Sequence, residues 1–595
     1  MNLMQIESIL LHGAHFTAEQ REVIQAIGRI DVVAGPGSGK TTVLAAKVLR
    51  LLTTRNYEDK GICCITHTNV AVKEILARLK LAGVDEIEYP NFVGTIQSFM
   101  DKFLGKTAFA TVLPGVTLKL LDDEKFYEKY DKNFRGIVKD YRSDWNVPKP
   151  SKNGCKLVIL DDGSFYYTNR HQNQRCQYAI NRACEWLLRD GYVSYSDLKS
   201  LSYWYLSKHR DELSVAFEKR FSYLMIDEAQ DTDWIQFAII NGLANGKQLN
   251  VQRFGDPYQA LYTIYGSETE DSWNPRPDNE FYQTKEISET TRFGSLIAAV
   301  VKHVCVQEYE QFHSNQELNF FPKYFMTYET GDELKEKHTR LIEDAASSNP
   351  NFRILQKPDA IVGIMHSDII KVEPKYSKEG SEQRAHERSV SEIYALVIKL
   401  LANANGVSFM EESVLIRNNH DSNLELADVI QKLAKQNISL NEVQYHLYSL
   451  IGSETISEAY LQRECKHLLQ DVSNLEGEPE RMNLSTVHRE FATIHGVKGE
   501  THRSTLLLLT SCVHMKFNEE DKINKFFKTI FPYLLGDRPD FSSDPEIEQL
   551  QRDCLKLAYV ALSRPKYLLA VAIPSQDLAD EKKTSLLTHG WVEAK

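Results

Sequence analysis

The chain has 595 residues, a net charge of −12 and nine cysteines, and apolar residues make up 42% of it. This length exceeds what one hydrophobic core supports, so we expect several domains, and the acidic balance excludes a protein that coats nucleic acid by bulk charge, though not one with a local basic groove. The cysteines are scattered and form no CxxC motif, so we expect no zinc ribbon or iron–sulfur cluster. The N-terminus has no signal-peptide pattern, and the apolar runs are far shorter than the roughly 20 residues of a membrane span. We therefore expect a cytoplasmic protein with no membrane segment.

Short apolar runs that end in polar or glycine residues recur along the chain and predict buried parallel strands. They lie at residues 30–37, 61–68, 223–230, 249–256, 412–419, 504–511 and 567–574. Helical patterns separate them, so the runs before 260 and after 410 predict two α/β domains. Residues 101–219 are predicted to be mainly helical, and the charged segment 374–390 is predicted to be a loop or linker.

The first of these runs leads into AGPGSGKTT, which has the spacing of a P-loop and precedes a helical pattern. In such a loop, glycines let backbone N–H groups face the phosphates, the lysine reaches the β- and γ-phosphates, and the next residue binds Mg²⁺ through its hydroxyl. Lys40 and Thr41 take these roles here. The predicted nucleotide-binding residues are Ala34 (in the first glycine position), Gly35, Pro36, Gly37, Ser38, Gly39, Lys40, Thr41 and Thr42.

A site for phosphate transfer also needs a carboxylate for the metal ion and a group that activates water. The stretch LMIDEAQDTD at 224–233 supplies both, at the end of a predicted strand. We expect Asp227 to hold Mg²⁺ through its water shell and Glu228 to act as the general base. The two motifs together predict an ATP-hydrolysing site.

Eight segments in order resemble the motifs of the UvrD/Rep/PcrA class of superfamily 1 DNA helicases. They are FTAEQRE (16–22), CITHTNVAVKEI (64–75), VGTIQSF (93–99), DEAQD (227–231), FGDPYQALY (254–262), SETTRF (288–293), TIHGVKGE (493–500) and AYVALSRPKYLL (558–569). The resemblance covers almost the whole chain. It implies an α/β fold with two RecA-like parallel-sheet motor domains and helical insertions.

By this resemblance, the first motor domain comprises 1–100 and 220–285, with a helical insertion at 101–219. The second comprises 286–420 and 485–595, with a reduced insertion at 421–484. ATP and Mg²⁺ are the implied cofactors, and single-stranded or tailed DNA is the implied partner.

The resemblance also implies roles for single residues. Gln20 and Arg21 read adenine, Gln259 senses the γ-phosphate, and Glu500 is the candidate for the ribose contact. Arg292 and Arg564 stabilise charge on the transferring phosphoryl group when the two domains close, with Arg564 as the arginine finger. The implied DNA-binding residues are Thr66, His67, Asn69, Thr95, Tyr262 and His495.

Several positions depart from the family pattern. His67 replaces an aromatic residue, Ile264 and Tyr265 replace a Trp and an Arg, and Thr291 replaces the Tyr that stacks on adenine in relatives. Base stacking contributes about 1–3 kcal/mol per base, so these changes predict a weaker grip on DNA. The chain ends shortly after Arg564, and we expect no nuclease domain.

Three functions are compatible with these residues and with the resemblance. The first is a 3′→5′ translocase and helicase in anti-phage defence or DNA repair. The second is a DNA-stimulated ATPase that regulates a partner nuclease with little unwinding. The compact chain resembles the helicase subunit (GajB-like) of Gabija anti-phage systems, which implies an OLD-family nuclease (GajA-like) as partner in a hetero-oligomer. The third and lowest is an RNA helicase.

The stretch TIHGVKGETH at 493–502 has two readings. His495, Glu500 and His502 are metal-ligand types, but zinc usually takes more ligands than this turn offers. The family resemblance instead implies a segment that couples ATP to DNA. Thr501 stands where relatives place the ribose-contacting glutamate, so either Glu500 reaches the ribose through a shifted turn or this contact is lost.

Overall fold

The computed structural model describes residues 1–11, 14–54, 60–139, 146–246, 248–261, 273, 275, 281–307, 309–376, 385–405, 416, 420–434, 439–451, 458–474, 487, 489–510 and 525–594. The chain divides into two compact units. The first comprises Met1–Lys323, Cys512–Leu569 and Thr588–Gly590, and the second comprises Tyr324–Ser511, Ala570–Leu587 and Trp591–Lys595.

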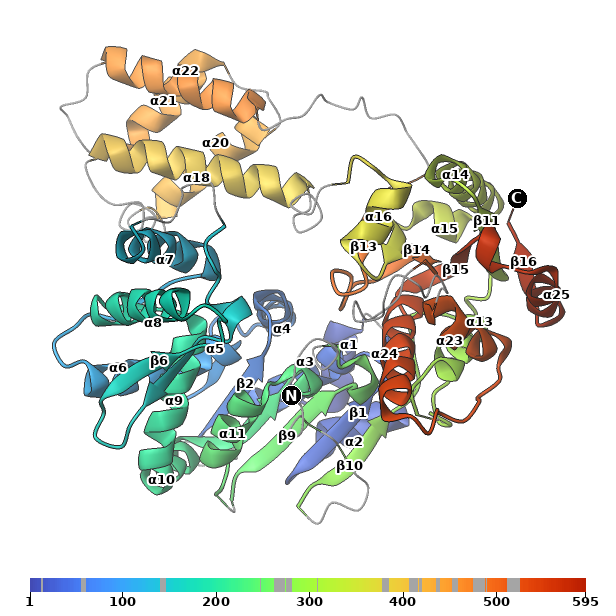
Figure 1. The fold of residues 1–595 in the computed structure, drawn as a ribbon, viewed down its shortest axis with the longest axis horizontal. Coiled ribbons are helices and arrows are strands. Elements are labelled where there is room, and N and C mark those ends of the chain that lie inside the picture. Colours follow the sequence, from blue (N-terminus) through green and yellow to red (C-terminus); the bar gives the residue numbers. More distant parts are fainter. Residues whose placement is uncertain are drawn as a thin grey trace. The chain divides into compact units, whose positions relative to one another are not determined.

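A six-stranded sheet in the order β10-β1-β9-β8-β2-β3 forms the centre of the first unit (Figure 1). All its neighbouring strands pair in parallel. The strands are β1 (Ile30–Ala34), β2 (Gly61–Thr66), β3 (Phe92–Thr95), β8 (Phe221–Ile226), β9 (Asn250–Gly255) and β10 (Gln283–Ile287). The four strands expected before residue 260 are confirmed, and β3 and β10 are additional.

Both faces of this sheet are covered, because alternate strand residues point to opposite sides. One face packs against α1 (Leu3–Leu10), α2 (Ala18–Gln25), α3 (Lys40–Thr53) and α4 (Asn69–Leu81). The other packs against α5 (Ile96–Met100), α9 (Tyr195–Lys208), α10 (Arg210–Arg220) and α11 (Trp234–Leu243). In β2, Cys64 belongs to the first core and Cys63 to the second. The strand ends that follow β1, β8 and β9 therefore meet at one edge of the sheet.

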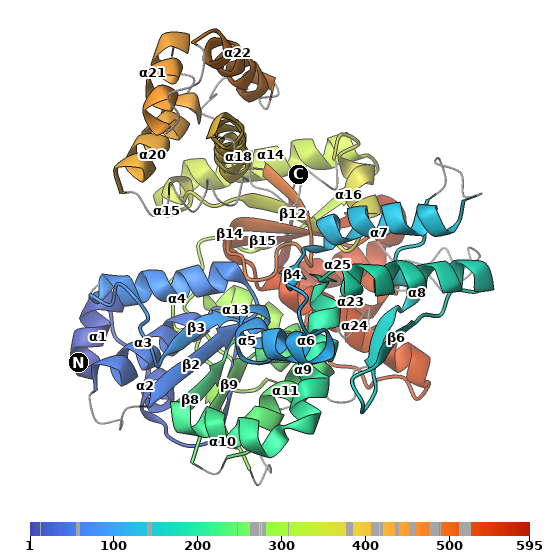
Figure 2. The same cartoon turned by 90° about the vertical axis from the view of Figure 1, so that its left-hand side faces the viewer.

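The segment 101–219 builds its own core within the first unit. A π-helical turn, Asp101–Gly105, leads into α6 (Lys106–Val112), and α7 (Asp123–Ile137) lies beside α8 (Gln174–Arg189) (Figure 2). The expected helical character is present. Two small sheets are additional: β5 (Lys156–Ile159) with β6 (Phe165–Thr168), and β4 (Lys119–Leu120) with β7 (Tyr192–Val193).

Three further helices of the first unit follow its sheet in the sequence. They are α13 (Ser295–His303), α23 (Lys525–Leu535) and α24 (Pro545–Leu562). Both α23 and α24 contact α13. The last turn of α24 leads directly to Ser563 and Arg564, so this helix positions the predicted arginine finger.

A second six-stranded sheet has the order β13-β12-β14-β15-β11-β16. Its strands are β11 (Lys323–Tyr328), β12 (Asp359–Gly363), β13 (Arg489–Thr493), β14 (His502–Leu508), β15 (Pro565–Pro574) and β16 (Trp591–Glu593). Strand β12 pairs in parallel with β13 and β14, and β11 with β15. The strands expected at 504–511 and 567–574 are confirmed, and two parallel sheets confirm the α/β class. The helices here are α14 (Gly331–Ser348), α15 (Pro350–Ile354), α16 (His366–Val372) and α25 (Asp580–Thr588).

Four helices gather into a separate core within the second unit (Figure 2). They are α18 (Ala385–Asn405), α20 (His420–Ala434), α21 (Leu440–Leu450) and α22 (Glu458–Asn474). The linker expected at 374–390 is wrong from Ala385 onward, because α18 begins there. Only Ile416 of the strand expected at 412–419 is described, and it is buried in this helical core. The boundary of the second insertion at 421 stays a prediction, although α18 shares this core.

No helix in the described ranges has both the length and the apolar character needed to cross a lipid bilayer.

Candidate active site

The loop between β1 and α3 has the backbone of a phosphate cradle. Gly37 and Gly39 both have φ of 75°, in the left-handed region that glycine adopts without strain. Gly39 caps α3, and its carbonyl accepts the first helical hydrogen bond from Val43. Lys40 and Thr41 are thus the first two residues of the helix, where backbone N–H groups attract anions.

The back of this loop is closed by residues distant in the sequence. A β-carbon on Gly35 would lie 2.7 Å from the Phe312 ring, and one on Gly37 would lie 2.5 Å from the Arg292 β-carbon. The backbone N–H of Thr291 donates to the Gly37 carbonyl at 3.0 Å. Close packing therefore requires glycine at both positions, and the positive φ of Gly37 favours glycine there as well.

Lys40 contacts the predicted general base. Its Nζ lies 2.5 Å from Glu228 Oε2, and burial lowers the lysine pKa less than the charges of Glu228 and Asp227 raise it. The net result is a raised pKa, so Lys40 is fully protonated at neutral pH. The structure thus brings the P-loop lysine and the acidic strand end together, as the motifs predicted.

Buried carboxylates crowd the ends of β8 and β9. Asp227 and Asp256 are each 1% exposed. Burial and the neighbouring Glu228 charge raise the pKa of Asp227 to about 7, with Lys40 opposing, and burial raises the pKa of Asp256 to about 6. A divalent cation beside Asp227 would relieve this repulsion. Thr41 and Asp227 fit Mg²⁺, which in phosphate sites uses one or two protein carboxylates and the phosphates themselves.

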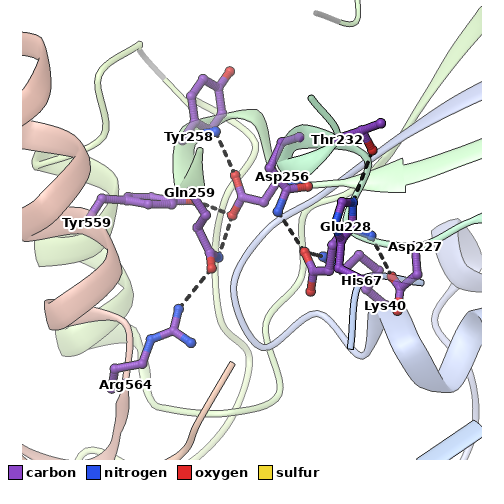
Figure 3. Close-up of polar contacts among 11 residues, drawn as sticks. Lys40, His67, Asp227, Glu228, Thr232, Asp256, Tyr258, Gln259, Tyr559 and Arg564 are labelled. Atoms are coloured by element: carbon purple, nitrogen blue, oxygen red, sulfur yellow. Dashed lines mark hydrogen bonds and ion pairs between the residues drawn. The ribbon is translucent and has the colours of Figure 1, made fainter. Parts of the chain in front are cut away.

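An arm of hydrogen bonds runs from Asp256 to Arg564 (Figure 3). Asp256 Oδ2 accepts from Gln259 Nε2 at 2.7 Å and from the Tyr559 hydroxyl at 3.2 Å. Gln259 Oε1 accepts in turn from Arg564 Nη2 at 3.0 Å. The predicted γ-phosphate sensor and the predicted finger are therefore in direct contact, and Tyr559 on α24 is a member of the arm that the motifs did not indicate.

Arg292 lies close to Arg564 and to the P-loop. Its Nη1 donates to the Ser563 carbonyl at 2.9 Å. Desolvation and the positive charge of Arg564 lower the pKa of Arg292, with Glu228 opposing. Two guanidinium groups held together in this way form a strongly attractive position for the negative charge of a phosphoryl group.

The two residues expected to read adenine have contacts within the protein. Gln20 Nε2 donates to the Ser38 carbonyl at 2.8 Å, so this side chain supports the P-loop. Arg21 Nε donates to Glu7 Oε1 at 3.0 Å. Glu7 is buried, which opposes its ionisation, but the hydrogen bonds from His15 and Phe16 and the charge of Arg21 lower its pKa overall. Helix α1 thus holds Arg21 through Glu7.

The residues expected to bind DNA lie mostly at the carboxyl ends of β2 and β3. His67 Nε2 lies 3.1 Å from the Thr232 hydroxyl, and Thr95 caps α5 through the Ser98 N–H. Thr66 is 1% exposed, whereas Asn69 is exposed at the start of α4. Tyr262, Ile264 and Tyr265 lie outside the described residues. The contact with Thr232 places His67 next to the acidic strand end, whereas Thr95 ends β3, which β2 separates from β8.

The segment TIHGVKGETH lies in the second unit, between β13 and β14. The ring of His502 is fully buried at the start of β14, 3.5 Å from Glu500 Oε2, and its Nδ1 lies 2.9 Å from the Thr505 hydroxyl. Burial and Lys498 lower the pKa of His495. No group of three or more metal-ligating side chains is present in the part of the chain that the structure describes. The Glu500 carboxylate thus lies beside the buried ring of His502 and belongs to no metal site in this part of the chain.

Comparison with known proteins gives one family. Residues 16–272 match the family model for the UvrD/REP helicase N-terminal domain. The Probable DNA helicase II homolog of Mycoplasma genitalium is 24% identical over 96% of this chain and 86% of its own length. The Probable DNA helicase of Mycoplasma pneumoniae is 25% identical over 48% of this chain, and the ATP-dependent DNA helicase PcrA of Staphylococcus epidermidis is 20% identical over 80%.

The coverage of these relatives varies. The match spans 54% of the Mycoplasma pneumoniae protein and 65% of the Staphylococcus epidermidis one, so the chain spans roughly half to two thirds of these curated relatives. The family match includes the P-loop, both acidic strand ends and Gln259. Arg292 and Arg564 lie beyond it, and their assignment depends on the contacts described above.

Proposed function

The chain belongs to the UvrD/Rep type of superfamily 1 DNA helicases, and from this premise we propose that it hydrolyses ATP with Mg²⁺ to move along single-stranded DNA in the cytoplasm. The direction of movement is 3′→5′, and duplex DNA ahead of the motor is unwound. Two sets of contacts carry the proposal. Lys40 contacts Glu228, and Gln259 connects Asp256 to Arg564.

The chemistry follows from the positions of these groups. Lys40 and the N-terminus of α3 bind the phosphates, and Gln20 keeps the loop in shape through Ser38. Glu228 accepts the proton of the attacking water. Arg292 and Arg564 stabilise the charge that develops on the phosphoryl oxygens. Mg²⁺, when bound by Thr41 and Asp227, neutralises phosphate charge and orients the γ-phosphate.

Gln259 is placed to report the state of the phosphate site. It contacts Asp256 beside the acidic strand end and Arg564 after α24. A change at the γ-phosphate would therefore alter the link to Tyr559 and α24 as well. This arm is the route by which hydrolysis could change the position of α24, and so drive movement along DNA.

A second function has one specific observation in its favour. His67, which stands at an aromatic position of the family, is hydrogen-bonded to Thr232 rather than presented as a stacking platform. With net charge −12, a weaker grip on DNA favours a DNA-stimulated ATPase that activates a partner nuclease. In this form the protein would serve anti-phage defence with an OLD-family nuclease, whereas the motor form also suits DNA repair. RNA unwinding ranks below both.

Strand displacement on duplexes with a 3′ or a 5′ single-stranded tail, with ATP turnover measured in parallel, tests the proposal. Displacement from the 3′-tailed substrate alone supports the motor. Turnover stimulated by single-stranded DNA without displacement supports the regulator, and stimulation by RNA but not DNA would contradict both.

Lys40→Ala and Glu228→Gln should each abolish ATP turnover, and a near-normal rate in either variant would overturn the assignment of the site.

A further inference from the structure

A buried glutamine joins the two acidic strand ends. Gln230 is 3% exposed and lies in the short turn Ala229–Asp231 after Glu228. Its Nε2 donates to Glu228 Oε2 at 2.7 Å. Its Oε1 accepts from the backbone N–H of Asp256 at 3.1 Å. One amide therefore touches both the candidate general base and the start of the Asp256–Gln259–Arg564 arm.

The orientation of this amide follows from its partners. A backbone N–H can only donate, so the atom that faces Asp256 must be the amide oxygen. The amide nitrogen then faces Glu228, where it can donate to a carboxylate. The opposite orientation would set donor against donor at Asp256 and acceptor against acceptor at Glu228, so the network itself assigns the atoms.

Close packing holds the amide in place. A β-carbon on Gly255 would lie 2.4 Å from Gln230 Oε1 and 2.3 Å from the Trp273 ring. Trp273 is 3% exposed, and its Nε1 donates to Asp31 Oδ1 at 2.9 Å. The Gln230 amide and the Trp273 ring thus both lie against Gly255 of β9, where no larger residue would fit. Packing of this kind helps to keep a supporting side chain in one geometry.

The backbone conformation of Glu228 is unusual, and two donors hold its carboxylate. Its φ of 52° makes it the one non-glycine residue with positive φ among those described, and the carboxylate projects from this unusual turn. Both Lys40 Nζ and Gln230 Nε2 donate to the same oxygen, Oε2. A lysine that binds phosphate shares its donors with the nucleotide. Gln230, by contrast, has no role in the proposed phosphate binding.

We propose that Gln230 is a positioning residue that holds the Glu228 carboxylate for its action as general base. This inference rests on the proposed ATP hydrolysis. In that step the oxygen of water forms a bond to the γ-phosphorus, the bond from phosphorus to the bridging oxygen breaks, and ADP leaves with that electron pair. Glu228 Oε1 or Oε2 accepts the proton that the water loses. Gln230 fixes the direction of that carboxylate without touching the reacting atoms.

Two substitutions separate the two hydrogen bonds of the amide. Gln230→Met keeps the length of the side chain and removes both bonds, whereas Gln230→Glu keeps an acceptor for the Asp256 N–H and removes the donor to Glu228. We expect both variants to lose kcat for ATP by roughly tenfold or more, since they disturb general-base catalysis. ADP affinity, measured by calorimetry with Mg²⁺, should stay within about threefold of the parent, as should KM. Near-parental kcat in Gln230→Glu together with a loss in Gln230→Met would overturn the proposal, because it would assign the role to the Asp256 contact.

Two further measurements keep the outcome unambiguous. Gln252→Met replaces another buried glutamine of the same sheet, whose Nε2 donates to the Ala26 carbonyl, and should keep kcat within about twofold. In a Glu228→Gln background, Gln230→Met should cause no further loss of the residual hydrolysis that a single-turnover assay detects, since residues that act as a unit are not additive. Parental turnover in Glu228→Gln would overturn the proposed function itself. Loss in Glu228→Gln with parental kcat in Gln230→Met would overturn only the positioning role.

Discussion

Arg564 is buried, and hydrogen bonds hold its guanidinium group both to the end of α24 and to Gln259. It donates from Nε to the Val560 carbonyl at 2.8 Å and from Nη2 to the Ser563 hydroxyl at 2.9 Å and to Gln259. Two of these contacts fix the side chain to the end of α24. The third connects it to Gln259, the proposed phosphate sensor, so the geometry of Arg564 is set before any phosphate charge develops.

Arg564→Ala should therefore slow ATP hydrolysis far more than it weakens ATP binding. We expect kcat to fall by roughly 10³-fold, as for arginine fingers generally, with nucleotide affinity changed by less than about tenfold. Single-turnover hydrolysis and equilibrium binding measure the two quantities. Arg552→Ala is the matched control, because Arg552 lies on the same helix and pairs with Glu548 outside the site. Equal losses of rate and affinity would contradict the finger role.

Gly37 combines two demands that can be separated by substitution. Gly37→Ala places a β-carbon against Arg292 and Thr290, whereas Gly83→Ala meets nothing within 4 Å, although both glycines have positive φ. The left-handed backbone alone costs roughly 1–2 kcal/mol for alanine. We expect Gly83→Ala to show only this cost in thermal melting. Gly37→Ala should show a larger loss of melting temperature and should also lose nucleotide binding; an equal effect of the two would mean that the loop has room to move.

Among elements, α14 carries a histidine in an unusual place. His338 is 1% exposed, and neither ring nitrogen has a hydrogen-bond partner among the residues that the structure describes. Burial, with the charges of Arg489 and Arg503, lowers its pKa to about 4, while Asp359 opposes. The native state therefore holds this imidazole neutral, whereas an unfolded chain would protonate it below pH about 6.5.

This difference makes stability depend on pH with a definite sign. The contribution is fully present above pH about 6.5 and is lost as pH falls toward 4, because the unfolded state then binds the extra proton. We expect a loss of about 2 kcal/mol in the free energy of unfolding between pH 7.5 and pH 5 from this group alone. His338→Leu should remove that part of the loss in urea titrations at the two pH values. An unchanged pH dependence would show that the ring finds a partner when charged.

The elements also show how far the sequence could lead. Strands β1, β2 and β14 are buried throughout, so their apolar runs are visible in the sequence. Strand β10, QTKEI, and strand β13, REFAT, are only partly buried and carry polar residues, so no apolar run marks them. Strand β12, DAIVG, is also buried throughout, so its apolar run is visible in the sequence as well. The first turns of α18 are charged, which made a helix look like a linker.

Some residues of the candidate site could also be predicted from the sequence, and others could not. Lys40, Asp227 and Glu228 were predictable, because each stands in a motif whose spacing is set by one turn of backbone. The pairing of Arg21 with Glu7 was not, nor was the role of Tyr559. These depend on which helix packs against which strand end, and no local pattern records that. Gln230 belongs to the DEAQD motif, yet only its contacts with Glu228 and Asp256 indicate a role for its side chain.

At the scale of the whole molecule, the charge of −12 constrains how a nucleic acid can be held. An acidic protein repels DNA on average, so binding must come from local phosphate contacts that release counter-ions. We expect the affinity for single-stranded DNA to fall linearly with salt on logarithmic axes, with a slope of about 0.7 for each phosphate contact. Fluorescence anisotropy over a series of KCl concentrations measures the slope. A flat line would mean that DNA is held without phosphate contacts and would remove the basis for translocation.

The glycines without room for a β-carbon have a consequence for how such sequences change over time. Gly35 meets Phe312, Gly37 meets Arg292 and Gly255 meets Trp273, each pair distant in the chain. A lineage that acquires a larger residue at one position must lose volume at its partner, so the members of each pair should vary together among descendants. The proposed catalytic side chains need not show such linked changes. Pairs like these would therefore act as inherited markers of the fold around the phosphate, even where the motifs themselves have drifted.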